Sequence, residues 1–156
     1  MLIDDAIAAL KANSIAEPRK VPPPTPEQIR AAEAALGLRF PPSFLSFLQL
    51  AGAYALPFWE TYWVGDESLA DREIVAANRA EREDSEVPLP PYLVAFHNNG
   101  CGDHYCFDTT RPDLAGEYPI VFWDHESTAE ANMADLVVMA PTFAHWLMDQ
   151  VESSTA

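Results

Sequence analysis

Basic residues are scarce in this chain, and its second half has almost none. The 156 residues include 9 lysines and arginines against 24 aspartates and glutamates, for a formal net charge of −15. From Glu83 onward there are 13 acids and a single base, Arg111. Nucleic acid and anionic membranes repel such a surface, so we expect neither as a direct partner. Two interpretations stay open: the acids keep the protein soluble, or they steer a basic protein partner.

The chain also lacks long hydrophobic runs and has only two cysteines. No apolar run approaches the ~20 residues that span a bilayer. The first residues, MLIDDAIAALKANS, have acids where a signal peptide is basic or apolar. Two cysteines without an export signal favour a reducing compartment. Because 49% of the residues are hydrophobic, the length and composition fit one ordinary domain, and we expect it to be soluble and cytoplasmic.

Helices are expected first, then antiparallel strands, then a closing helix, which is the order of an α+β fold. A short helix over 3–13 and a proline-rich linker over 17–24 form a segment 1–24 that precedes a single domain at 25–156. Thr25, Pro26 and Gln28 predict a capped helix start. Other helices are predicted over 42–50, 68–83 and from 141, and a second capping box at Ser127 and Glu130. Strands are predicted over 53–64 with a break at Pro57, and over 93–97, 104–108 and 120–123, whereas 136–139 suits either structure.

Four residues of zinc-ligand type lie within ten positions, at His97, Cys101, His104 and Cys106. Their spacing matches none of the usual paired knuckles separated by a longer loop. Strand alternation also places Cys106 in a strand and Cys101 in a turn. We therefore predict no metal and no cofactor.

The sequence Asp124-His125-Glu126 suggests an acid–base group, but adjacent side chains diverge along a strand. A strand-end cluster that bonds to neighbouring backbone is the competing interpretation, and the one we favour. The serines have no elbow glycines around them. We predict no catalytic residues and no enzyme activity.

The glycine-rich stretch around Cys101 lacks the lysine of a phosphate-binding loop. Gly100 and Gly102 are expected to supply backbone angles that other residues resist, and Asp103 to hydrogen-bond within the turn.

Aromatic residues lie beside acids near the middle of the chain. Trp59 and Trp63 alternate with Glu60 and are followed by Asp66 and Glu67. Such a mixture is typical of protein-binding surfaces. It fits equally well with tryptophans in the core and solvated acids, so both interpretations stay open.

Four blocks, in order, resemble the SUKH superfamily, whose best-known members are the yeast Smi/Knr cell-wall assembly regulators. The resemblance covers about residues 25 to 150, and Ala51 stands where members often carry asparagine. The blocks are the capped helix running into Ala34-Ala35-Leu36-Gly37 and Phe40-Pro41-Pro42, then Ser43-Phe44-Leu45-Ser46-Phe47-Leu48 ending at Gly52, then the stretch 100–108, and finally 119–126.

The resemblance implies one antiparallel sheet packed with helices and no catalytic residues to carry over. Bacterial members resemble immunity proteins that neutralise a cognate toxin, often a nuclease, and eukaryotic members are regulatory interaction proteins. We expect a protein that binds a basic toxin, with a general regulatory or scaffold module as the alternative and a metal-dependent enzyme as the least favoured. The oligomeric state stays open between a monomer and a weak dimer. The candidate binding residues are Trp59, Glu60, Trp63, Asp66, Glu67, Asp108, Asp113, Glu117, Trp123, Asp124 and Glu126.

Overall fold

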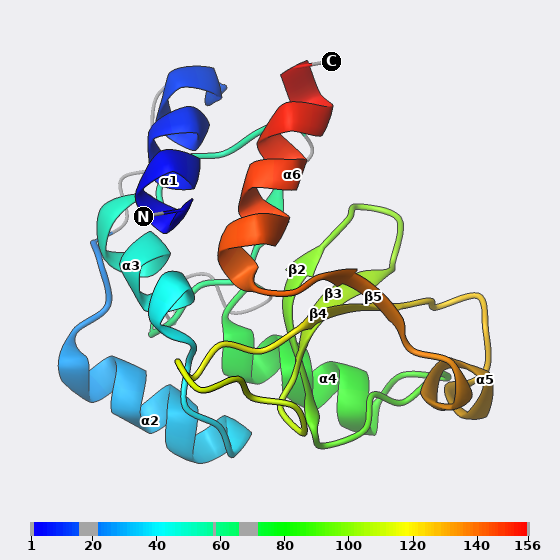
Figure 1. Cartoon of the computed structure of the whole chain (residues 1–156). Coiled ribbons are helices and arrows are strands. Elements are labelled where there is room, and N and C mark those ends of the chain that lie inside the picture. Colours follow the sequence, from blue (N-terminus) through cyan, green and yellow to red (C-terminus); the bar gives the residue numbers. More distant parts are fainter. Residues whose placement is uncertain (1, 16–21, 58, 66–71, 156) are drawn as a thin grey trace.

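The computed structural model describes residues 2–15, 22–57, 59–65 and 72–155, and over these the chain has the expected α+β architecture. No helix in these ranges is long and apolar enough to cross a membrane. The elements, labelled in Figure 1, are α1 (Leu2–Asn13), α2 (Pro26–Leu36), α3 (Pro42–Leu50), β1 (Glu60–Thr61), α4 (Ile74–Glu83), β2 (Leu93–Asn98), β3 (His104–Asp108), β4 (Ile120–Trp123), α5 (Ala129–Ala134), β5 (Val137–Ala140) and α6 (Phe143–Thr155).

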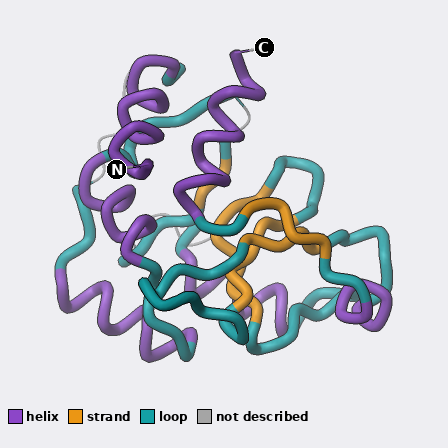
Figure 2. Tube along the Cα trace, viewed as in Figure 1, coloured by secondary structure: helices purple, strands orange, loops and turns teal. Residues whose placement is uncertain are grey.

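The strands form one antiparallel sheet in chain order, from β1 at one edge to β5 at the other. Cys106 of β3 lies opposite Ala95 of β2 on one side and Val121 of β4 on the other. Helix α4 packs against β2, whereas α1, α3 and α6 pack together. Figure 2 shows these three helices grouped beside the strands. The sheet therefore has a well-covered centre and two different edges.

Aromatic side chains fill the centre of the core. Phe44 of α3, Phe107 of β3 and Phe143 of α6 have no exposed surface. The ring centroids of Phe44 and Phe107 are 5.2 Å apart, and those of Phe96 and Phe107 are 4.4 Å apart. Such ring pairs stabilise the fold by more than the apolar area that they bury. The aromatic residues thus join α3 and α6 to the middle strands.

The start of α2 follows the predicted capping box. Thr25 Oγ1 accepts a hydrogen bond from the backbone N–H of Gln28, and Gln28 Oε1 accepts one from the N–H of Thr25 at 2.9 Å. Gly37 ends the helix with φ 75°, a left-handed conformation that favours glycine.

Helix α1 belongs to the same hydrophobic core as the rest of the chain. Ile3, Ala6, Ile7 and Leu10 recur at helical spacing and are buried, with α6 as the main neighbour. The linker predicted over 17–24 falls mostly on residues 16–21, which lie outside the described residues. The predicted segment 1–24 is therefore attached to the core by α1.

Three predicted elements differ from those observed. Over 53–64 only Glu60–Thr61 is a strand, because a turn and Pro57 interrupt the segment. The helix predicted over 68–83 begins at Ile74 within the described residues. Helix α5 is capped by Thr128, whose side chain accepts from the N–H of Ala131, so the capping box at Ser127 was wrong by one residue. The ambiguous run 136–139 is a strand.

Candidate functional site

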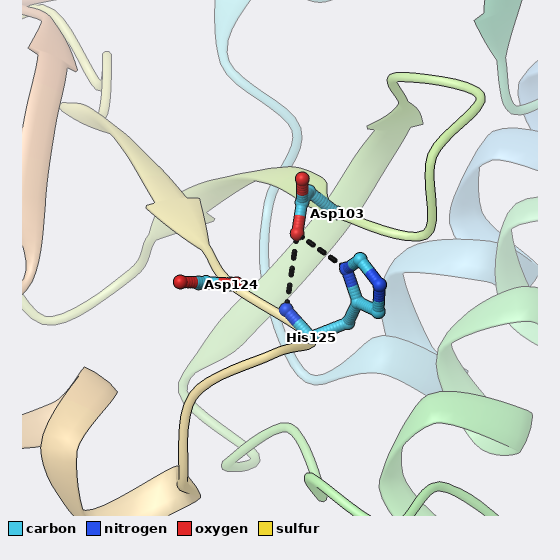
Figure 3. Close-up of side chains that lie close together, drawn as sticks. All are labelled: Asp103, Asp124 and His125. Carbon is cyan, nitrogen blue, oxygen red and sulfur yellow. Dashed lines mark hydrogen bonds and ion pairs between the residues drawn. The ribbon is translucent and has the colours of Figure 1, made fainter.

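The chemistry-bearing residues of the 92–126 region meet where β4 ends. His104 of β3 pairs with Trp123 of β4. Asp103, just before His104, therefore lies near the residues that follow Trp123. Asp103 Oδ1 accepts two hydrogen bonds from His125, from the backbone N–H at 3.0 Å and from Nδ1 at 2.6 Å (Figure 3). The acid and the histidine thereby join the two strand ends.

The hydrogen bond between Asp103 and His125 shifts the pKa values of the two groups in opposite directions. Partial burial acts to raise the pKa of Asp103, but hydrogen bonds from His125 and Asn99 outweigh it, and the pKa lies below its ordinary value. The hydrogen bond to Asp103 raises the pKa of His125, and the charges of Asp103, Glu126 and Asp124 act in the same direction. Because His125 is exposed, we expect this ion pair to add little stability.

The turn before β3 is held by its own side chains. Asn99 Oδ1 accepts from the N–H groups of Cys101 and Asp103, at 2.9 and 3.2 Å. Gly100 and Gly102 have φ of 84° and 97°, and a Cβ on Gly102 would lie 3.1 Å from the His125 ring. Both glycines and the aspartate therefore have structural positions in this turn.

Among the described residues, one group of three metal-ligand types gathers, namely Asp103, Asp124 and His125, with ligand atoms within 4.8 Å of one another. Each acid already accepts a hydrogen bond, Asp103 from His125 and Asp124 from the N–H of Glu126 at 2.8 Å. A cation here would have to displace the 2.6 Å bond between His125 Nδ1 and Asp103. The arrangement fits a hydrogen-bonded strand end better than a preformed metal centre.

The four zinc-ligand types of the sequence do not form a ligand group among the described residues. His97 Nδ1 is hydrogen-bonded to Thr61 Oγ1 at 2.8 Å, and His104 Nε2 to the Tyr62 hydroxyl at 2.7 Å. Burial lowers the pKa of His97 to about 3 and that of His104 to about 4, so both rings are neutral at pH 7.

The two cysteines lie in opposite environments. Cys101 is exposed in the turn, whereas Cys106 is fully buried. Burial raises the pKa of the Cys106 thiol, which disfavours the thiolate that binds metals or attacks substrates.

The loop that follows β4 is fixed to α5. Asn132 Oδ1 accepts from the N–H of Asp124 at 3.1 Å, and Asn132 Nδ2 donates to the Asp124 carbonyl at 2.9 Å. Asn132 is buried, whereas Glu126 and Glu130 are exposed. A rigid support thus carries carboxylates that face solvent.

Three acids of the predicted binding set lie at the other end of β4, roughly 13 Å away along the strand. Asp108 is 2% exposed and accepts from Thr110 and from Arg111 Nε. Glu117 accepts from the N–H and the hydroxyl of Ser43, at the start of α3 where Pro41 offers no side-chain cap. Asp113 is exposed and accepts from two N–H groups of its own turn. The structure does not bring these acids to Asp124 and Glu126.

All three candidate tryptophans are core residues. Trp59, Trp63 and Trp123 are 8%, 3% and 1% exposed, so of the two open interpretations the structure supports the core. Glu60 is half-buried on β1, at the opposite edge of the sheet from β5. Asp66 and Glu67 lie outside the described residues. The tryptophans are thus not exposed anchors for a partner.

The exposure of strand β5 was not predicted from the sequence. Val137, Val138 and Met139 of β5 are 53%, 48% and 43% exposed, and Met133 of α5 is 41% exposed. The apolar run was visible in the sequence, but its position at a sheet edge was not. Exposed apolar groups rimmed by polar residues are a mark of protein-binding surfaces.

Comparison with known proteins gives a family and a fold. A family model described as "SMI1-KNR4 cell-wall", SUKH_5, matches residues 3–152. The match begins before residue 25, where we expected the resemblance to begin, and so includes α1. A solved structure, "Crystal structure of protein from Pseudomonas syringae pv. tomato", is similar with a TM-score of 0.67 and 20% identity, over 96% of this chain and 98% of that one. No curated protein matches the chain.

Proposed function

The chain belongs to the SMI1-KNR4 cell-wall family, and on that premise we propose that it is a non-enzymatic, immunity-type protein that binds and neutralises a basic, nuclease-like toxin. A toxin that acts on nucleic acid needs a basic cleft, because contacts to phosphate dominate its binding. An acidic protein of complementary shape can occupy such a cleft and exclude the substrate. Electrostatic attraction then speeds the encounter and favours this partner over neutral ones.

The observation that carries the proposal is the acidic surface where β4 meets α5. Glu126, Glu130 and Asp135 are exposed there, and Asp124 is half-exposed. No lysine or arginine follows Arg111 in the chain, so neither residue type offsets these charges within the last 45 residues. Exposed ion pairs contribute little one by one, so tight binding also needs apolar contacts, and Met133 of α5 is exposed among these acids. We define Asp124, Glu126, Glu130 and Asp135 as the acidic rim.

Co-expression with the protein encoded beside this gene tests the proposal. We expect a stable complex and loss of the partner's nuclease activity at equal molar ratio. Changing Glu126, Glu130 and Asp135 together to lysine should weaken binding at least about tenfold at low salt, and less at high salt. Glu152→Lys, an exposed site on α6, is the control for a change of charge alone.

The outcomes separate the competing functions. A complex that forms equally well with the triple variant would contradict the placement of the surface. If the neighbouring gene encodes no toxin, and no purified neighbour has a nuclease activity that this protein inhibits, the immunity role is wrong and the regulatory module is favoured.

A further inference from the structure

The two edges of the sheet are finished in different ways. Strand β1 covers only part of β2, and side chains of α4 complete the remainder. Asn78 Nδ2 donates to the carbonyl of Ala95 and Asn78 Oδ1 accepts from its N–H, both at 2.8 Å. Arg82 donates to the carbonyl of Leu93 at 3.1 Å. The amide of Asn78 thus takes the place of a neighbouring strand where β1 does not reach.

The edge at β5 has no such cover among the described residues. Strand β5 pairs with β4 on one side, and no described strand, loop or side chain hydrogen-bonds to Val137–Met139 from the other. Three consecutive residues are about half exposed, so neither face of this strand is covered by a helix layer. Figure 1 shows β5 at the end of the sheet, directly after α5. Natural sheets usually protect such edges with lysine, proline or a covering segment.

Strand β5 has few features that would hinder pairing with a further strand. Met139 has no register partner on β4 and forms a bulge, because Val138 pairs with Val121 and Ala140 with Ile120. The strand has no lysine and no proline, and Pro141 follows only after it ends. Backbone N–H and C=O groups alternate between the two sides of a strand, so one of Val137 and Val138 directs its pair to the open side. Apolar side chains lie beside that pair, and strand addition uses such a surface.

The acidic residues near β5 favour a positively charged binding partner. Asp135 lies two residues before the strand, and Glu126 follows β4, whose Phe122 pairs with Val137. Glu130 stands on the adjoining α5. The acidic rim therefore lies at the start of β5, while the apolar residues continue away from it.

We infer that β5 is a docking edge to which an extended segment of the partner adds as a further strand, with apolar side chains along Val137–Met139 and lysine or arginine against the acidic rim. The inference rests on the proposed function and adds the mode of binding. A second copy of this chain is a poor occupant, because each molecule carries a net charge of −15 and the two rims would repel.

A peptide probe tests the edge directly. The probe is a short, end-capped stretch of alternating valine and threonine with three lysines at one end, made with the lysines at either terminus to allow both strand directions. We expect NMR shifts confined to Val137–Ala140 and the acidic rim, and slower hydrogen exchange in β5, for one of the two peptides. N-methylation of alternate peptide residues removes backbone donors and should weaken binding about tenfold or more.

The same experiment contains the results that overturn the inference. The inference is wrong if the NMR shifts lie elsewhere, or if neither lysine peptide binds at about 5 mM. It is also wrong if the N-methylated peptide, or a peptide with glutamates in place of lysines, binds as tightly as the lysine peptide. Sedimentation that shows a dimer sensitive to Val138→Lys would identify a second copy as the occupant and would also overturn it.

Protein variants separate this inference from the proposed function. Val138→Lys places a charge on the edge, and Leu114→Lys makes the same change at an exposed position in the β3–β4 connection. With the partner from the co-expression experiment, Val138→Lys should weaken binding about tenfold and Leu114→Lys should not. If both variants bind like the unmodified chain while the triple rim variant binds weakly, the edge is wrong and the proposed function stands. If the partner is no toxin but the peptides bind at β5, the edge stands and the function is wrong.

Discussion

The hydrogen bond between Asp103 and His125 makes a prediction at the scale of single residues. Asp103→Asn removes the carboxylate that raises the pKa of His125, so this pKa should fall toward the ordinary histidine value near 6.5. An NMR titration of the His125 ring measures the change. Asp124→Asn is the control, because Asp124 bonds to the N–H of Glu126 and not to the ring, and it should lower the pKa less. An unchanged pKa in Asp103→Asn would contradict the bond.

Buried histidines predict how stability depends on pH. The folded-state pKa values of His97 and His104, about 3 and about 4, lie below the unfolded value near 6.5. The folded state therefore binds fewer protons, and their contribution is complete above pH 6.5 and is lost as the pH falls toward 4. At pH 5 the loss is on the order of 2 kcal/mol per histidine. Urea unfolding between pH 7 and pH 4.5 measures this decline.

A variant of His104 checks this prediction, and the opposite contribution of His125 has to be considered beside it. His104→Gln should make the decline with acid about half as steep. His125 acts in the opposite sense, because its raised pKa gives stability that is present below pH 6.5 and lost above it, but its side chain is exposed and the effect is weak. Stability that is flat between pH 7 and pH 5 would contradict the buried, neutral state of both rings.

At the scale of elements, the attachment of α1 is the least expected feature. Leu10 is fully buried against the core, so Leu10→Ala should cost about 2–5 kcal/mol of unfolding free energy. Ala8 is exposed on the same helix, and Ala8→Ser should change stability by no more than about 0.5 kcal/mol. Denaturant unfolding measures both. If the domain begins at residue 25 and α1 is dispensable, Leu10→Ala will match the control.

The elements differ in how far local sequence determines them. The capping box at Thr25 and Gln28 and the glycine stop at Gly37 are local hydrogen-bonding and backbone effects, and they were predicted to the residue. A strand over 53–64 was predicted from the aromatic residues of that segment. In the structure Trp59, Tyr62 and Trp63 are buried in the core, but most of the backbone of this segment is irregular. Burial requires apolar side chains but does not require a strand.

For the whole molecule, the net charge of −15 predicts a dependence of stability on salt. Excess like charge destabilises the compact state, and added ions screen the repulsion. The midpoint of thermal unfolding should therefore rise between about 0.01 and 0.2 M NaCl, over which the Debye length falls from roughly 30 Å to below 10 Å. A midpoint that falls or stays level would show that local ion pairs outweigh the overall repulsion.

The sequence by itself determined the α+β class, the turn at Gly100–Asp103 and the acidic character of the second half, which follow from local periodicity, backbone preferences and composition. It also determined the family, through the resemblance of four sequence blocks. The tertiary structure decided that Trp59, Trp63 and Trp123 are buried and that the candidate acids fall at two ends of the sheet. It also decided that Val137–Met139 form an open edge. Exposure depends on which elements cover a residue, and coverage is set by contacts between segments far apart in the chain, which no local pattern specifies.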